Sequence, residues 1–440
     1  MLVGTLTVLT TYLLMSRLAG RMFGLATAAL LAAFHYHIHF SRLGSNQVAD
    51  ALFAGLALLF LFRGYDRRSP LFWTLSGVVL GASQFFYAGA RFAAVLVAVV
   101  TLVLFLRDGR RFWREQWVGV ALLAGALLIS GAPMIQYALR FPDDYNARLN
   151  EVGIIQSGWL EREQEIRGQD ALPILFDQFQ RAVLAYNAYP DRTVWYGIPR
   201  PYFTLIPGTL FILGIGYAGL NLFNRRIFPL VAWWGGAILM GGMLTESPPS
   251  SQRLVTTAVP AMALLVLALM LIVQGLWRAI GSRGMQIPAL ALAAATVLIG
   301  FGSARYYFVE YTPLRVYGNM NAVVATELAD YANRAVGPEG RLYFFGPPRM
   351  YVDFGTIPYL APQVAGVSIV EPLARPPGPE LVSADKDAVF VFLPEREGEL
   401  AQVRQAYPDG DYTLVPSPID GAPLFSVYTV PRDALVIRAP

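Results

Sequence analysis

The three histidines of the sequence, His35, His37 and His39, lie in one stretch that joins two long apolar runs. Arg42 and Asp50 follow within the same stretch. Polar and ionisable groups beside runs of membrane-spanning length are costly, and they mark functional sites. We therefore expect this stretch to form one wall of a site at the outer mouth of a helical membrane bundle.

The spacing of the histidines allows two interpretations. On a helix, His35 and His39 share a face one turn apart, whereas His37 points elsewhere. Such a pair can begin a metal site with a divalent metal as cofactor, but a third ligand must come from another helix. The favoured alternative is that the histidines belong to an interfacial belt with the aromatic residues between them.

Asp50 is the acid at the start of an apolar span, and it too has two interpretations. A carboxylate in the first turn of a helix is stabilised by the helix dipole. The functional interpretation is a general base, which would be catalytic, or a metal ligand. The sequence gives both equal weight.

Three arginines, Arg42, Arg91 and Arg253, lie near ends of apolar segments, with Asp50 and Glu246 as the nearby acids. Arginine binds phosphate with two parallel hydrogen bonds and stays charged in a dry setting. The sequence therefore predicts an anion site with these three arginines as phosphate ligands, the alternative being that each reaches outward to lipid headgroups. The expected supporting residues are His37, His39, Asn46, Gln47, Tyr87 and Glu246.

The composition is that of a membrane protein. The chain is 55% hydrophobic and 15% charged, against about 25% charged in an average soluble domain. A bilayer-spanning helix needs roughly 20 apolar residues, and at this segment length only helices satisfy their own backbone in lipid. We predict a polytopic α-helical bundle of about ten spans. The segments are 2–16, 22–40, 46–62, 70–88, 92–106, 117–135, 203–221, 227–244, 255–277 and 287–303.

The arginines set the predicted orientation in the membrane. Alternate short loops hold thirteen arginines on one side, whereas the loops on the other side hold three. Because cytoplasmic loops carry the excess of basic residues, the stretch of histidines and the carboxyl-terminal residues are expected outside the cytoplasm. The net charge of the whole chain is +4, and the excess of positive charge lies in the membrane part, because the carboxyl-terminal residues 303–440 carry more acidic than basic groups. Topology explains it better than nucleic-acid binding, so no nucleic-acid partner is expected.

Two further segments complete the predicted organisation: a membrane domain over 1–303 and an extracytoplasmic domain over 304–440. The membrane domain contains a long outer loop, 136–202, with amphipathic helices expected over 155–187. In the carboxyl-terminal domain, short apolar strands alternate with helices at 319–336 and 395–407, which predicts a small α/β domain with a mixed sheet. Cysteine is absent, which excludes disulfides and thiolate-bound metals.

A family resemblance rests on the order of several motifs. The loop Arg-Leu-Ala-Gly-Arg from Arg17 precedes a helix of small residues, His-Ile-His-Phe-Ser-Arg, an acid eight residues on, and a helix that ends in Phe-Arg-Gly at Gly64. Tyr87-Ala-Gly-Ala-Arg and Arg253-Leu-Val follow. This pattern resembles glycosyltransferase family 39, which includes the dolichyl-phosphate-mannose–protein mannosyltransferases and the bacterial aminoarabinose transferases that modify lipid A.

The resemblance implies a GT-C fold in a multi-pass protein of the cell membrane. It implies a polyprenyl-phosphate-linked sugar as donor, a protein or lipid acceptor, membrane lipids as surroundings, and reaction at the extracytoplasmic face. In such a reaction a carboxylate deprotonates the acceptor hydroxyl. Positive charge stabilises the departing lipid phosphate, a role that Arg42 and Arg253 match.

The resemblance also leaves two functions open. The family's catalytic acid lies in the first outer loop, and this sequence begins at what corresponds to the second helix, so we expect that acid to be absent from it. Either the start site is miscalled or the chain is a truncated member, and in the second case Asp50 would have to substitute for the acid. The first function is a glycosyltransferase with a lipid-phosphate donor. The alternative is a non-catalytic, truncated or inactive homologue that binds or handles lipid-linked sugars.

Overall fold

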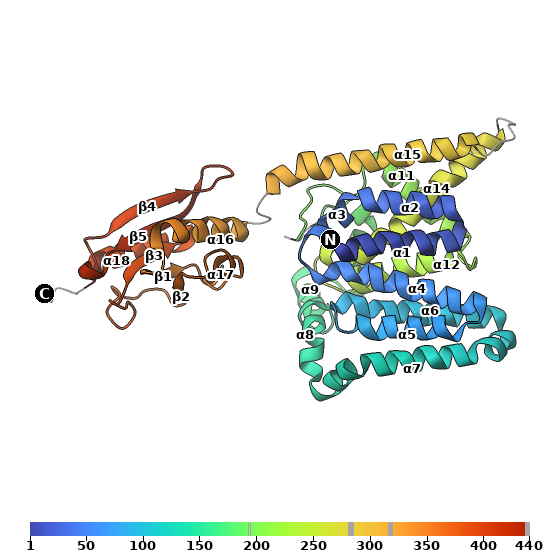
Figure 1. The fold of residues 1–440 in the computed structure, drawn as a ribbon, viewed down its shortest axis with the longest axis horizontal. Coiled ribbons are helices and arrows are strands. Elements are labelled where there is room, and N and C mark those ends of the chain that lie inside the picture. Colours follow the sequence, from blue (N-terminus) through green and yellow to red (C-terminus); the bar gives the residue numbers. More distant parts are fainter. Residues whose placement is uncertain (192, 194, 280–285, 316–319, 436–440) are drawn as a thin grey trace. The chain divides into compact units, whose positions relative to one another are not determined.

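The computed structural model describes residues 1–440 except for 192, 194, 280–285, 316–319 and 436–440. The chain divides into two compact units, Met1–Glu310 and Tyr311–Pro440. The first is a helical bundle, and the second is a small sheet with helices packed on it (Figure 1).

Apolar helices make up the first unit, and ten of them coincide with the ten predicted segments. Six are long and apolar enough to cross a membrane, and four are shorter. The protein is therefore a polytopic helical membrane protein, as predicted. Its principal helices are α1 (Leu2–Ala19), α2 (Arg21–Ala33), α4 (Ala49–Arg67), α5 (Pro70–Ser83), α6 (Phe92–Asp108), α7 (Arg110–Arg140), α11 (Leu205–Leu220), α12 (Phe228–Ala237), α14 (Ala258–Ala279) and α15 (Gln286–Arg305).

The second predicted segment, 22–40, is not one continuous helix. Helix α2 ends at Ala33, and Phe34 is extended, with φ −73° and ψ 115°. A separate helix, α3 (His35–Arg42), then begins. The ring of Phe34 packs against Phe203, with centroids 5.4 Å apart, so tertiary packing fixes the break and gives α3 a direction of its own.

The long apolar helices differ in how much of their surface is buried, which distinguishes central helices from those at the edge of the bundle. Helices α4 and α14 are the most buried of the long apolar helices, whereas α7 and α15 are largely exposed and lie at opposite edges (Figure 1). Small residues bring α5 and α7 together: Gly77 faces the backbone of Leu123, and Gly81 faces Ser130. Close packing through small residues is how helices associate where the hydrophobic effect is weak.

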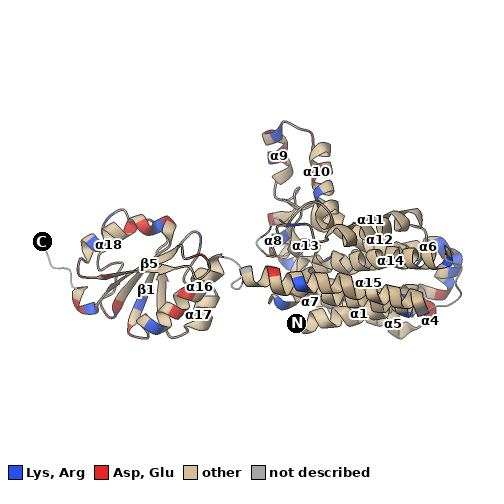
Figure 2. Cartoon of the chain, turned by 90° about the horizontal axis from the view of Figure 1, so that it is seen from above, with Lys and Arg blue, Asp and Glu red and all other residues tan. Residues whose placement is uncertain are grey.

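The long loop between α7 and α11 is helical in part. It contains α8 (Pro142–Val152), α9 (Trp159–Arg167) and α10 (Ala171–Val183), so the helices expected over 155–187 are present. In Figure 2, α9 and α10 form a hairpin that projects sideways from the end of the bundle where α8 lies. We call this the α8 end of the bundle. Arginines gather at the opposite end (Figure 2).

The second unit is built on one mixed sheet, as predicted. Its strands are β1 (Gly340–Phe345), β2 (Ala365–Ser368), β3 (Asp387–Phe392), β4 (Asp411–Pro416) and β5 (Pro423–Val430). They follow the order β2-β1-β3-β5-β4, with β1 parallel to β2 and β3, and β5 antiparallel to β3 and β4. Alternate side chains of β1 enter two cores, because successive residues of a strand face opposite ways. Helices α16 (Met320–Tyr331), α17 (Thr356–Leu360) and α18 (Leu400–Ala406) complete the unit; residue 319, the predicted start of the first of them, lies outside the described residues.

Candidate functional site

The histidines bond to backbone carbonyls. The His35 ring is 2.8 Å from Tyr202 O through Nε2 and 2.8 Å from the Tyr196 hydroxyl through Nδ1. His39 Nε2 lies 2.7 Å from Trp195 O. These contacts hold α3 against the segment that precedes α11.

The third histidine, His37, is buried on another side of α3. Its Nε2 lies 3.2 Å from Gly4 O in α1. Across the described residues, no group of three or more histidine, aspartate or glutamate side chains could hold a metal ion. The pair at His35 and His39 therefore gains no third ligand from another helix in this part of the chain.

Asp191 is a buried carboxylate that the sequence analysis missed. It accepts hydrogen bonds from the Thr193 N–H at 3.1 Å, the Gly197 N–H at 2.9 Å and the Ser251 N–H at 3.1 Å. Ser251 begins the short helix α13 (Ser251–Leu254), which carries Arg253. Asp191 thus fixes the loop before α11 to the arginine-bearing turn. The aspartate followed two residues later by threonine was the available signal, because such pairs form local turns.

Arg253 is largely buried, with a side chain 10% exposed. Its Nη1 donates to Glu246 O at 2.7 Å, and its Nη2 lies 3.8 Å from a carboxylate oxygen of the same residue. Its Nε is buried without a hydrogen-bond partner. A buried donor without a partner costs about 1–3 kcal/mol, so Arg253 can accept a further anionic ligand.

Arg91 lies at the same end of the bundle, in the turn Ala88–Arg91. Both its terminal nitrogens donate to Tyr145 O at 3.2 Å, and the guanidinium lies 3.6 Å from the centroid of the Tyr145 ring. Tyr145 comes from α8 and donates to Gln84 at 3.4 Å. The outer loop therefore covers the predicted anion site through α8.

Arg148, one turn further along α8, is a residue that the sequence analysis did not select. Its Nη1 donates to Glu151 at 2.6 Å. Partial burial alone would lower the pKa of Arg148, but its hydrogen bonds to Glu151 and Tyr87 outweigh this and raise the pKa above its ordinary value. Arg148 also acts electrostatically on Arg253, as Tyr87 does. We refer to Arg91, Arg148 and Arg253 as the arginine cluster.

Asp50 lies in the first turn of α4 and is 2% exposed. Its carboxylate packs on Gly89, where a Cβ atom would overlap it. Its Oδ1 has no hydrogen-bond partner, and no ion pair to it is seen among the described residues. Gly89 stands between Tyr87 and Arg91 in the chain, so Asp50 lies against the turn that carries Arg91.

The remaining predicted residues divide between two places. Gln47 is buried with an unpartnered Oε1, and Asn46 is exposed beside it. Arg42 lies 5.6 Å from the ring centroids of Tyr307 and Phe308. The contacts of Arg42 and Arg253 have no residue in common, so the structure does not show them acting on one phosphate.

The site has the electrostatics of an anion-binding surface. Three arginines face two paired acids, Glu151 and Glu246, and several buried polar atoms have no partner. The turn Val255–Thr257, which follows α13, packs on α4 and on α3. Arginine side chains and buried polar atoms without partners are groups that can bind an anion.

Comparison with known proteins supports the resemblance. A family model described as dolichyl-phosphate-mannose-protein mannosyltransferase matches residues 1–135. Among the curated proteins, no sequence matches the chain.

Two solved structures share the fold. The crystal structure of ArnT from Cupriavidus metallidurans bound to undecaprenyl phosphate has a TM-score of 0.52 at 15% identity, covering 97% of this chain and 82% of that one. The same protein in the apo state has a TM-score of 0.54 at 12% identity, covering 100% and 83%. The chain therefore has an ArnT-like fold, and its first 135 residues match the mannosyltransferase family model, which confirms the predicted resemblance to glycosyltransferase family 39.

Proposed function

We propose that the protein is a membrane glycosyltransferase that takes its sugar from a polyprenyl-phosphate donor and transfers it to a hydroxyl of a protein or lipid acceptor. The observation that carries the proposal is the arginine cluster beside the buried Asp50, at one end of an ArnT-like bundle. ArnT itself binds undecaprenyl phosphate in its crystal structure. The reaction would take place on the extracytoplasmic side, to which the arginine-poor loops assign the α8 end.

The proposed reaction uses a carboxylate as base and arginines to stabilise the leaving phosphate. A carboxylate accepts the proton of the acceptor hydroxyl as its oxygen attacks the anomeric carbon. The bond from that carbon to the phosphate oxygen breaks, and the lipid phosphate departs with an added negative charge. Arg253 and Arg148 stabilise that charge. Asp50 is the candidate for the base, and Arg91 holds Tyr145 over the site.

Donor binding tests the phosphate site directly. The full chain in lipid nanodiscs would be titrated with a polyprenyl phosphate. Loss of one charge-assisted hydrogen bond costs about 1.5–3 kcal/mol, so Arg253→Ala and Arg148→Ala should each weaken binding by about 10- to 100-fold. Arg111→Ala is the matched control, because Arg111 is 73% exposed and pairs with Glu115 outside the site. Unchanged affinity in both site variants would remove the assignment.

Turnover separates the enzyme from its non-catalytic alternative. Asp50→Asn keeps the shape of the side chain and removes the base, so release of polyprenyl phosphate should fall about 10²- to 10⁴-fold with donor affinity unchanged. A wild-type chain that binds donor and does not turn it over would instead be a protein that handles lipid-linked sugars. Full activity of Asp50→Asn would show that another group is the base.

A further inference from the structure

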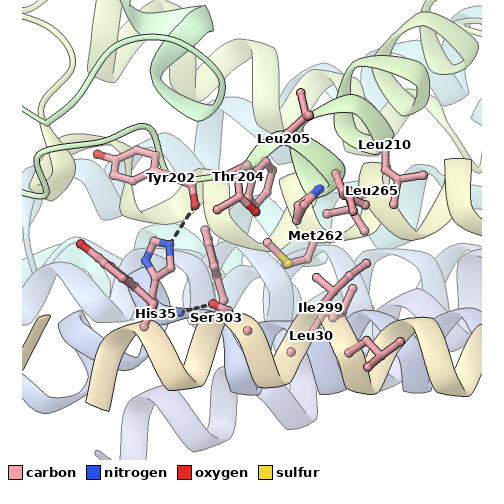
Figure 3. A pocket seen from close by; sticks show the side chains of 18 of the residues that line it. Leu30, His35, Tyr202, Thr204, Leu205, Leu210, Met262, Leu265, Ile299 and Ser303 are labelled. Carbon is pink, nitrogen blue, oxygen red and sulfur yellow. Dashed lines mark hydrogen bonds between the residues drawn. The ribbon is translucent and has the colours of Figure 1, made fainter. Parts of the chain in front are cut away.

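A recess lies next to His35, the first residue of α3. It is a groove of about 720 Å³ between α2, α11, α14 and α15. Figure 3 shows Leu30, Met262, Leu265 and Ile299 lining it from three of these helices. This volume lies within the roughly 300–1,000 Å³ of small-molecule sites, and the walls are apolar over most of their length.

One end of the groove is polar. It is lined there by His35, Ser303, Tyr306 and Arg200. The guanidinium of Arg200 lies 3.3 Å from the centroid of the Tyr306 ring. Its Nε is buried without a hydrogen-bond partner. No ion pair of Arg200 is seen in the described part of the chain, because Glu310, the acid at this mouth, pairs with Arg305.

The groove has the depth of one membrane leaflet. Along α15 and the turn that continues it, the lining runs from Tyr306 at the polar end to Ala295, a distance of about 16 Å at the helical rise per residue. Half of a bilayer's hydrocarbon core is roughly 15 Å. An amphiphile with its charged group at Arg200 would therefore end its chain near the midplane, as the acyl chains of bilayer lipids do.

A wall of packed rings separates this groove from the arginine cluster. Tyr36 stacks on Tyr202 with centroids 4.3 Å apart, and its hydroxyl donates to Ser251 O. His35 closes the same wall by bonding Tyr202 O, as Figure 3 shows. An anion at Arg200 is thus distinct from one at Arg253.

We propose that this groove is a binding site for an anionic glycerophospholipid. One acyl chain lies between α2, α11, α14 and α15, and the phosphate lies against Arg200. The assignment rests on charge complementarity at the mouth and on the depth of the apolar part, and it is independent of the glycosyltransferase proposal. A polyprenyl chain is longer than the groove, whose lining along α15 ends at Ala295.

The test measures lipids retained by the full chain. Protein from nanodiscs that contain equal amounts of phosphatidylglycerol and phosphatidylcholine would be analysed by native mass spectrometry. The wild type should retain phosphatidylglycerol selectively, and Arg200→Ala should reduce that retention at least tenfold. Arg111→Ala removes an arginine that is 73% exposed and pairs with Glu115 outside the groove, and it should change nothing.

A second variant blocks the space for the acyl chain and leaves Arg200 in place. Gly302 lines the groove, and a Cβ atom there would meet nothing within 4 Å, so Gly302→Leu fills the groove without disturbing the helix. It should also release the lipid, whereas Gly216→Leu, at an equally open position of α11, should not. Equal retention of both phospholipids, or retention unaffected by Arg200→Ala, would overturn the proposal. So would a polyprenyl phosphate that occupies the groove in their place.

Discussion

Asp191 shows how much of the site depends on a single buried carboxylate. It is 8% exposed and accepts hydrogen bonds from three backbone N–H groups. Two of these groups belong to its own loop, and the third belongs to Ser251, sixty residues away. The carboxylate therefore converts two separate loops into one support for Arg253.

Asp191→Ala should loosen this support. Leaving buried N–H groups without an acceptor costs about 1–3 kcal/mol each, so the midpoint of thermal unfolding in detergent should fall by several degrees. Trypsin should also cleave after Arg253, on the helix that Asp191 holds through Ser251, faster than in the wild type. Asp433→Ala is the control, because Asp433 is 93% exposed. An unchanged midpoint and cleavage rate would mean that Asp191 contributes nothing to this junction.

Residue types were easier to predict than residue partners. The sequence identified Asp50, Arg91 and Arg253 because charged side chains stand out beside apolar runs. It grouped Arg42 with Arg253, whereas the structure places Arg42 against Tyr307 and Phe308. Arg148 was not selected because it lies on a loop helix with many charged residues. The sequence does not show which of these charged side chains points toward the bundle. Such contacts depend on tertiary packing, which local patterns do not encode.

The helical elements followed from hydropathy, but their junctions did not. Helix α10 packs on the π-helical turn Ile238–Met243, which continues α12. Gly242 allows this, because a Cβ atom there would lie 2.5 Å from that of Ala182. Gln178 of α10 donates to Thr245 O at 3.2 Å. The turn that leads to Glu246 is therefore positioned by a helix from a distant part of the sequence.

Gly242→Leu should push α10 off this turn. Overpacking costs about 1–3 kcal/mol, and the displaced helix should expose Arg181 to trypsin. Gly235→Leu is the matched control in the same apolar span, since a Cβ atom at Gly235 meets nothing within 4 Å. Donor affinity should fall with Gly242→Leu alone. Equal proteolysis of the two variants would show that the contact between α10 and the turn is not required.

At the scale of the molecule, the distribution of arginines along the sequence was the strongest guide to the orientation of the bundle in the membrane. The arginines that lie between α1 and α2, and between α4 and α5, gather at the end of the bundle opposite α8 (Figure 2). The sequence also predicted the mixed sheet of the second unit, because short apolar strands that alternate with helices leave a clear pattern. It could not predict the lipid groove, since four helices far apart in the chain create it.

The orientation of the whole molecule can be tested through its single lysine. Lys386 lies in the second unit, and its Nζ donates to Pro338 O at 2.6 Å in an exposed position. Because the arginine-rich loops should face the cytoplasm, this unit is expected outside. A membrane-impermeant amine reagent should therefore label Lys386 in intact spheroplasts as fully as in permeabilised ones. Lys386→Arg keeps the charge and removes the reactive amine, so any label that remains reports the amino terminus. If Lys386 were labelled in permeabilised spheroplasts and not in intact ones, the second unit would lie in the cytoplasm. The arginines could then no longer assign the α8 end to the extracytoplasmic side.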